Sequence, residues 1–262
     1  DHVSAPQYEV YAIKYAHHAR RASENFIGGD PHDGPMPLDY FVWLIRGAGR
    51  ELVVDTGFSA ATAARRQRDH LRCPTEGLRR LGCEARAVRD VVITHLHYDH
   101  VGNFDLFPAA TFHLQDKEMN YATGRHMAKP VFSGAFDVED VVGMVRNSYA
   151  GRVSFHDGDA TIAPGVSLHL IGGHTMGLQV VRVATRRGWV VLASDASHFY
   201  ANMEQARPFP IVFSVADMVE GYDRLRALAD SPAHVIPGHD PLVLARYPAP
   251  SAQLEGIVAR LD

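Results

Sequence analysis

The amino-acid sequence predicts a layered α/β fold with two mixed β-sheets flanked by helices. Strand-like segments fall into two groups along the chain, and helical segments are interleaved with the strands of both groups. No internal repeat of roughly 20–50 residues and no low-complexity tract interrupts this pattern. Since 262 residues with 46% hydrophobic content suffice for one sizeable core, we expect a single domain over residues 1–262.

The first group of strands lies near the N-terminus. Alternating apolar side chains predict strands over residues 8–13 and 40–45, and a third strand over 52–54 follows a glycine-containing turn. These segments indicate the start of an antiparallel sheet. Residues 20–37, between the first two strands, are rich in Gly, Asp, His and Pro. Because ordered loops of this length are commonly functional, we expect this one either to cover a site or to contact a second copy of the chain, which leaves a homodimer open.

Helices and strands alternate through the rest of the chain. Helical periodicity predicts helices over residues 59–70 and 75–81, with Gly82 placed to end the second, and a β-branched run over 91–93 predicts a strand that ends at Thr94. The remaining elements expected are a strand over 111–114, helices over 116–122 and 138–149, strands over 166–171, 179–183 and 189–193, a helix over 215–228, a strand over 234–236 and a closing helix over 251–261.

Composition excludes several classes of protein. The formal net charge of −4 provides no basic face for nucleic acid. No apolar stretch approaches the roughly 20 residues that span a bilayer, and the start at Asp1 and His2 lacks the pattern of a signal peptide. Cys73 and Cys83 are the two cysteines, for which we expect reduced thiols, with a disulfide between them as the alternative. The sequence therefore predicts a cytoplasmic protein without nucleic-acid or membrane partners.

Residues that can bind a metal ion recur where predicted strands end. They are His95, His97, Asp99, His100, His174, Asp195 and His239. One histidine on an apolar face is usually a packed core residue, but four of these residues follow Thr94 within six positions. Alternation along an extended segment places His95 and His97 on the same side, and a tight turn then brings Asp99 and His100 round a second centre. Nitrogen and oxygen ligands without cysteine indicate a catalytic site for two ions of zinc, cobalt, manganese or iron.

These residues resemble the signature of a known family. Residues 94–100, Thr-His-Leu-His-Tyr-Asp-His, resemble the HxHxDH motif of the metallo-β-lactamase superfamily, and His174, Asp195 and His239 follow in the order that this superfamily uses. The Asp-Thr-Gly sequence that begins at Asp55 also resembles its strand-and-turn segment. The resemblance extends from about position 40 to about position 240. It implies a four-layer αβ/βα sandwich with the metal ions at one edge, between the two sheets.

The resemblance also implies a role for each ligand. It implies that His95, His97 and His174 bind the first ion, that Asp99, His100 and His239 bind the second, and that Asp195 bridges the two. Two divalent ions, with Zn²⁺ as the first expectation, would then hold a bridging hydroxide that attacks the substrate carbonyl. Asp99 can also carry a proton from the attacking water to the leaving oxygen. Asp55 is expected to support the ligand loop through hydrogen bonds.

Within the superfamily, Asp195 indicates which branch the chain resembles. True β-lactamases carry cysteine at the corresponding position, whereas a bridging aspartate is the pattern of lactonases, glyoxalase II enzymes and phosphodiesterases. A glyoxalase II would add a C-terminal helical domain, for which too few residues follow His239. A tRNA-processing nuclease would add an exosite arm and a basic face. The chain therefore most resembles the N-acyl homoserine lactonases, which are compact hydrolases of small lactones.

One position departs from this branch. Many of these lactonases carry tyrosine three residues after the bridging aspartate, where this chain has His198. Either His198 or the nearby Tyr200 is expected to assist the substrate carbonyl. A groove for an acyl chain could be lined by Met36, Phe41, Phe107, Phe132 and Phe199, although such residues more often fill a core.

The function expected from these observations is metal-dependent opening of N-acyl homoserine lactones or similar small lactones. Two alternatives stay open at this point. One is hydrolysis of another ester, a thioester or a phosphodiester. The other is a metal-binding sensor that retains the fold without turnover.

Overall fold

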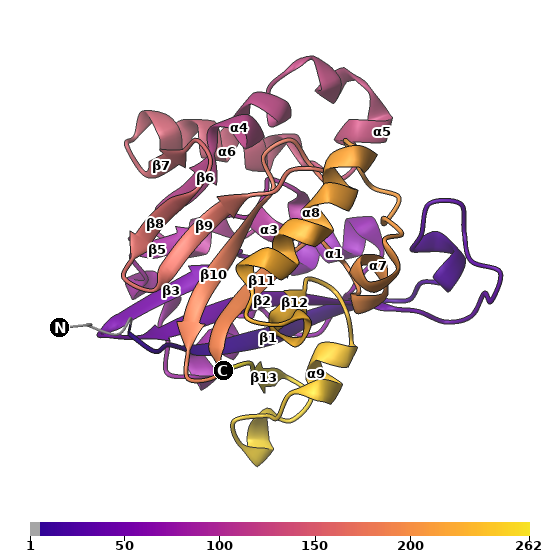
Figure 1. Cartoon of the computed structure of the whole chain (residues 1–262). Coiled ribbons are helices and arrows are strands. Elements are labelled where there is room, and N and C mark those ends of the chain that lie inside the picture. The colour runs from indigo at the N-terminus through magenta and orange to yellow at the C-terminus, as the bar shows by residue number, and fades with distance from the viewer. Residues whose placement is uncertain (1–5) are drawn as a thin grey trace.

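Two β-sheets pack face to face in the computed structural model, and helices cover the outside of the stack (Figure 1). The structure describes residues 6–262, so the chain start at Asp1 and His2 lies outside the described part. The larger sheet contains β1 (Glu9–His18), β2 (Leu38–Gly47), β3 (Arg50–Val54), β4 (Asp69–His70), β5 (Asp90–Val92), β6 (Thr111–Gln115), β7 (Val153–His156) and β13 (Val258–Arg260). The smaller sheet contains β8 (Ala160–Ala163), β9 (Val166–Leu170), β10 (Gln179–Thr185), β11 (Gly188–Ser194) and β12 (Val235–Pro237).

Both sheets are mixed, as the sequence predicts. The larger sheet has the order β13-β1-β2-β3-β5-β6-β7, with β4 paired to β1; it is antiparallel from β13 to β3 and parallel from β3 to β7. The smaller sheet has the order β12-β11-β10-β9-β8 and is antiparallel except for the pair β11 and β12. That parallel pair matters for the site, because the carboxyl ends of both strands meet at one edge.

The helices form the two outer layers. They are α1 (Ala60–Arg66), α2 (Pro74–Arg80), α3 (Tyr98–Val101), α4 (Asp116–Ala122), α5 (Pro130–Ser133), α6 (Val138–Tyr149), α7 (Tyr200–Gln205), α8 (Val215–Leu228) and α9 (Leu242–Arg246). One buried cluster joins α1, α2, α4 and α6 to one face of the larger sheet. A second cluster joins the other face to the smaller sheet and to α7 and α8. The expected four-layer αβ/βα sandwich is confirmed.

Three helices have the predicted bounds, namely α4, α6 and α8. The helix expected over 59–70 is shorter, because Gln67 takes a left-handed conformation at its C-terminus and Asp69–His70 pairs with β1 as β4. The pattern also did not predict β7, β8, α3, α5, α7 and α9. These elements are at most six residues long, too short for a periodic signal.

The prediction of a closing helix over 251–261 was wrong. Only a short 3₁₀ turn, Ala252–Leu254, forms there, and β13 follows it and pairs antiparallel with β1. Gly256 adopts a φ of 75° between the two, which ends any helical path. The pairing fills the free edge of β1 and buries Val258 and Ala259.

The segment over 20–37 projects from the body beside α7 as an arm (Figure 1). The amide of Ile27 donates to the carbonyl oxygen of Pro208, and the side-chain amide of Asn202 in α7 donates to the carbonyl oxygen of Asn25. The base of the arm, at Arg20, lines the cavity described below, so the arm flanks that cavity. Contact with a second copy of the chain stays a prediction.

Two further observations bear on the sequence predictions. Cys73 and Cys83 are both free, in agreement with the expected thiols. Among the helices of residues 6–262, none combines the length and the apolar character that crossing a bilayer requires.

Candidate active site

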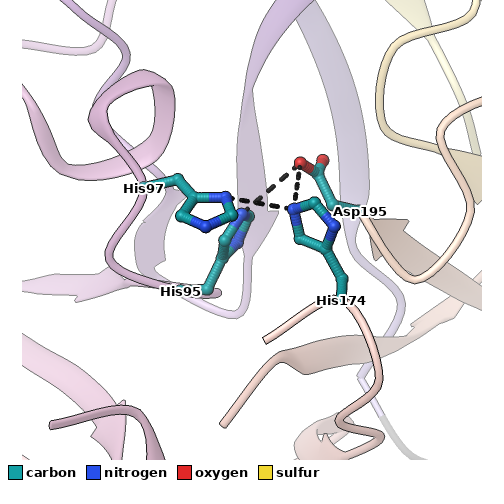
Figure 2. A group of neighbouring side chains, drawn as sticks. All are labelled: His95, His97, His174 and Asp195. Carbon is teal, nitrogen blue, oxygen red and sulfur yellow. Dashed lines mark hydrogen bonds and ion pairs between the residues drawn. The ribbon is translucent and has the colours of Figure 1, made fainter. Parts of the chain in front are cut away.

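The structure brings the seven predicted ligands together in two overlapping groups. The first group is His95, His97, His174 and Asp195, and the second is Asp99, His100, Asp195 and His239. Within each group, one nitrogen or oxygen atom per residue lies within 4.8 Å of the others, and all seven residues are buried. Asp195 belongs to both groups. Figure 2 shows the first, with the carboxylate of Asp195 facing the imidazoles of His95 and His174.

The distances in the first group converge on one point. The Oδ2 atom of Asp195 lies 3.4 Å from His95 Nε2 and 3.2 Å from His174 Nε2. The Nε2 atom of His174 lies 3.1 Å from His97 Nδ1. Three imidazole nitrogens and one carboxylate oxygen therefore face a common centre.

The second group has the same arrangement on the other side of Asp195. His100 Nε2 lies 3.1 Å from Asp99 Oδ2 and 3.2 Å from Asp195 Oδ2. His239 Nε2 lies 2.9 Å from Asp195 Oδ1 and 3.5 Å from Asp99 Oδ2. Because the two oxygens of Asp195 face different imidazoles, this carboxylate is placed between two centres.

The topology of the two sheets explains why these residues meet. The loop after β5 carries the run from His95 to His100, and α3 turns Asp99 and His100 towards the second centre. Asp195 and His239 follow the parallel neighbours β11 and β12, whose carboxyl ends lie side by side. Gly238 makes that approach possible, since a Cβ atom there would lie 2.6 Å from the carbonyl carbon of Ser194.

Buried hydrogen bonds fix the orientation of the ligand rings. Nδ1 of His174 donates to the carbonyl oxygen of Ile211 at 2.7 Å, and Nδ1 of His239 donates to the carbonyl oxygen of Asp39 at 2.9 Å. A carbonyl oxygen can only accept, so each ring carries a proton on Nδ1 and turns its Nε2 atom towards the group. Nε2 is therefore the atom that a metal ion would use in each ring.

Asp55 supports the ligand loop from beneath, as the resemblance implies. Its Oδ1 accepts from the amide of Thr94 at 2.8 Å, and its Oδ2 accepts from the Thr94 hydroxyl at 2.9 Å and from His100 Nδ1 at 2.6 Å. Asp55 has a φ of 63°, in the left-handed region that aspartate tolerates better than most residues. The carboxylate thereby connects the end of β3 to the ligand loop.

Glu118 is a supporting residue that the sequence reasoning missed. It is fully buried, and its two carboxylate oxygens accept from the amides of Leu96 at 2.8 Å and Gly177 at 3.0 Å. It therefore ties the loop after β5 to the loop that carries His174. An acidic residue on an amphipathic helix ordinarily faces solvent, so the pattern of α4 gives no signal for this role.

The chemistry of the donor set fits divalent metal ions. Nε2 of His95 is buried and has no hydrogen-bond partner in the described structure, which is costly for a polar atom unless a cation uses it. Burial opposes protonation of His100, but Asp195, Asp99 and Asp55 outweigh that effect and raise the pKa of His100 well above its ordinary value. The group thus favours positive charge at its centre. Each of the two groups could hold one ion of zinc type.

Burial opposes protonation of His239 as well, but Asp195 outweighs it and raises the pKa of this imidazole, whereas His95 and Asp195 keep the charge states that such ligands require. Burial, together with His100, lowers the pKa of His95 well below its ordinary value, so this imidazole stays neutral. Burial opposes ionisation of Asp195, yet His100 and His239 outweigh it and hold the pKa of this carboxyl well below its usual range. Neutral imidazole and ionised carboxylate are the ligating forms.

A cavity of about 280 Å³ opens over the ligands. Its lining includes His97, Asp99, His174, Asp195, His239, Leu38, Phe132 and Ile211. His198 also faces it: its ring stacks on Phe209 at a centroid distance of 3.8 Å, and its Nε2 lies 3.4 Å from Asp195 Oδ2. The cavity therefore combines polar groups on the ligand side with apolar wall residues.

The structure does not bring Tyr200 to this cavity. Its ring lies under Arg246, with the guanidinium carbon 3.9 Å from the ring centroid, and it lines hollows elsewhere on the surface. The N-terminus of α7 turns the side chain away, because the amide of Tyr200 donates to Asp240. Of the two expected helpers, His198 is the one at the site.

Of the expected groove residues, only Phe132 lines the cavity. Phe41, Phe107 and Phe199 are fully buried in the core, and Met36 packs against it. For these four residues the structure therefore supports the more common role, in which aromatic and methionine side chains fill the space between layers.

Comparison with known proteins agrees with this geometry. Residues 36–244 match the metallo-beta-lactamase superfamily. An N-acyl homoserine lactonase AttM from Rhizobium johnstonii is 31% identical over 176 residues, which cover 64% of this chain and 64% of that protein. The match thus spans a little under two thirds of that relative.

Solved structures show the same fold. A crystal structure of a quorum-quenching N-acyl homoserine lactone lactonase superposes with a TM-score of 0.75 at 22% identity, over 91% of this chain and 94% of that one. The structure of AidC, a dizinc quorum-quenching lactonase bound to its product, superposes with a TM-score of 0.69 at 16% identity, over 91% and 90% of the two chains.

Proposed function

Because this chain belongs to the metallo-β-lactamase superfamily, we propose that it is a metal-dependent hydrolase that opens the ring of N-acyl homoserine lactones or similar small lactones. The observation that carries the proposal is the position of Asp195, which is shared by two groups of buried ligands directly beneath a cavity. The relatives that are named as lactonases support the choice of substrate class.

His95, His97 and His174 would hold one ion, Asp99, His100 and His239 the other, and Asp195 would contribute to both. Zinc is the first expectation, because the donors are imidazole and carboxylate and because AidC is a dizinc lactonase. When bound, such ions supply Lewis-acid catalysis, in that they activate water near neutral pH and polarise an ester carbonyl.

The cavity selects and orients the substrate. Leu38, Phe132 and Ile211 provide apolar wall on which a lactone ring or a short acyl group can pack. The ring carbonyl then faces the ligand side, where His198 lies beside Asp195. Burial lowers the pKa of His198 well below its ordinary value, so its neutral imidazole can donate one N–H to the carbonyl oxygen.

Asp99 is placed to move the proton. In ring opening, the oxygen of water bonds to the carbonyl carbon, the ring C–O bond breaks, and a proton from the water must reach the leaving oxygen. Asp99 lines the cavity, and His100 and His239 keep it ionised despite its burial by lowering its pKa. An ionised carboxylate there can accept the proton from water and return it to the alkoxide. The product is a hydroxy acid, which near neutral pH ionises to its carboxylate and releases one proton.

A substrate panel tests the proposal. Purified protein is incubated with acyl homoserine lactones of several chain lengths, with thioesters and with phosphodiesters, before and after chelation. We expect proton release and ring opening with lactones, loss of both after chelation, and recovery on addition of zinc. A His95→Ala variant should be inactive, whereas His32→Ala, in the exposed arm, should match the parent protein.

The outcome that overturns the proposal is the absence of lactone opening across all chain lengths by protein that retains its metal. Turnover confined to thioesters or to phosphodiesters would assign one of those reactions instead. Metal binding without turnover of any substrate would indicate the sensor.

A further inference from the structure

The cavity over the ligands is also lined by three arginines, Arg20, Arg66 and Arg68. Arg66 is neutralised, because its Nη2 lies 2.6 Å from the carboxylate of Asp137. Arg20 and Arg68 have no carboxylate within ion-pair distance among residues 6–262. Two unneutralised guanidinium groups therefore face the space where a substrate would bind.

Neutral groups hold Arg68 in place. Its Nε donates to the hydroxyl of Tyr98 at 3.1 Å, and its Nη1 donates to the carbonyl oxygen of Arg66. Tyr98 directly precedes Asp99 in the chain, so Arg68 binds the side chain next to a predicted metal ligand. Tyr40 also hydrogen-bonds to this side chain, so phenol hydroxyls and a carbonyl oxygen, and no carboxylate, hold the guanidinium group at the cavity.

Arg20 is anchored in the same manner at the base of the projecting arm. Its Nε donates to the side-chain oxygen of Asn25 at 2.8 Å, and its Nη2 donates to the carbonyl oxygen of Glu24 at 2.7 Å. The guanidinium carbon lies 4.9 Å from the centre of the Phe209 ring, which stacks on His198. Arg20 therefore also lies one aromatic ring from the reacting side of the cavity.

The arginines are not needed to balance the acidic ligands. Two divalent ions already exceed the charge of the carboxylates of Asp99 and Asp195, so the loaded site is positive without them. The positive field also reaches neighbouring groups: burial, then Arg68, then Arg20, lower the pKa of His18 to about 4. Holding two half-buried cations beside a cationic centre is unfavourable unless an anion joins them.

We propose that Arg20 and Arg68 bind a carboxylate carried by the substituent of the lactone, so that the preferred substrates are lactones with an anionic side arm. This inference rests on the proposed function. A planar guanidinium group matches the two oxygens of a carboxylate, and two such groups that line one cavity can bind the same carboxylate.

Two isosteric substrates test the inference. One is N-glutaryl-homoserine lactone, which ends in a carboxylate, and the other is the same compound with the terminal carboxylate converted to a primary amide. We expect the parent protein to prefer the carboxylate by about tenfold or more in kcat/KM, the effect of one charge-assisted hydrogen bond. The preference should weaken at high salt.

Variants locate the preference. Arg68→Gln and Arg20→Gln should each lower kcat/KM for the carboxylate substrate about tenfold and leave the amide substrate within about twofold. Arg68→Lys should retain part of the preference that Arg68→Gln loses, because lysine keeps the positive charge but not the paired N–H donors of the guanidinium group. Arg80→Gln removes the same charge from the exposed face of α2 and should behave as the parent. If Arg68 only supported the structure, its replacement would instead lower kcat/KM for both substrates by the same factor.

Binding is measured separately by calorimetric titration with N-glutaryl-homoserine, the ring-opened product. Carboxylate-dependent binding that Arg68→Gln weakens about tenfold supports the inference even where no lactone is opened. Opening of both lactones with equal efficiency by every variant overturns the inference and leaves the proposed function intact. Preference of the same two arginines for a phosphorylated side arm over the carboxylate also overturns it.

Discussion

Replacing Asp55 by asparagine tests how much the site depends on a residue that cannot reach the metal ions itself. Asp55 is fully buried and accepts three hydrogen bonds, two from Thr94 and one from His100 Nδ1. Asparagine has the same shape and tolerates the left-handed conformation at this position. The substitution therefore changes the hydrogen bonding and leaves the backbone in place.

The amide of asparagine can accept on only one of its two atoms. The amide N–H of Thr94 cannot change its direction, so the asparagine oxygen should stay with it and the NH₂ group should face His100 Nδ1. His100 must then carry its proton on Nε2, the nitrogen that faces Asp99 and Asp195. Loss of one charge-assisted hydrogen bond costs about 1.5–3 kcal/mol. That corresponds to roughly ten- to hundredfold weaker binding at the second ion.

The assay is metal content by elemental analysis after dialysis against graded concentrations of chelator. We expect the parent protein to keep about two ions per chain under conditions in which Asp55→Asn keeps about one. The matched control is Asp90→Asn, which removes a carboxylate 2.9 Å from the imidazole of His113, away from the ligand groups. Retention of both ions by Asp55→Asn with unchanged affinity would refute the reasoning.

Three further predictions concern the proton path, the carbonyl helper and the field of the arginines. Asp99→Asn should lower kcat by about a hundredfold or more and change KM little, as steady-state kinetics will show. Tyr200→Phe should leave kcat unchanged and His198→Phe should lower it, because only the histidine faces the cavity; equal loss in both would contradict the structure. By NMR titration, His18 should titrate near pH 4 in the parent protein and closer to its ordinary 6.5 in Arg68→Gln. Because this pKa is lowered on folding, His18 should reduce stability as the pH falls from 6.5 towards 4, since the unfolded chain takes up the proton first.

The ligand groups could be predicted from the sequence because the relevant information is local. A β-branched strand followed by four ligands in six positions predicts more than half of the site at the end of one strand. The motif resemblance adds His174, Asp195 and His239. The long amphipathic helices were equally predictable, since α6 and α8 each contain three or more turns of periodic pattern.

What the sequence did not reveal depends on contacts between distant segments. Residues 258–260 form a strand only because β1 offers a free edge. Glu118 is buried only because two loops, far apart in the chain, present their amides to it. Tyr200 and His198 are two positions apart, yet the start of α7 turns one of them away from the cavity. None of these outcomes has a local signal.

The most direct test of the central claim, a lactone hydrolase with two metal ions sharing Asp195, is reconstitution of metal-free protein. Zinc is added in steps while ring opening of an acyl homoserine lactone is followed by proton release. We predict that turnover rises until about two equivalents of zinc are bound and then levels off, and that Asp195→Ala does not recover. Full turnover at one equivalent, or turnover that persists in the metal-free protein, would contradict the claim.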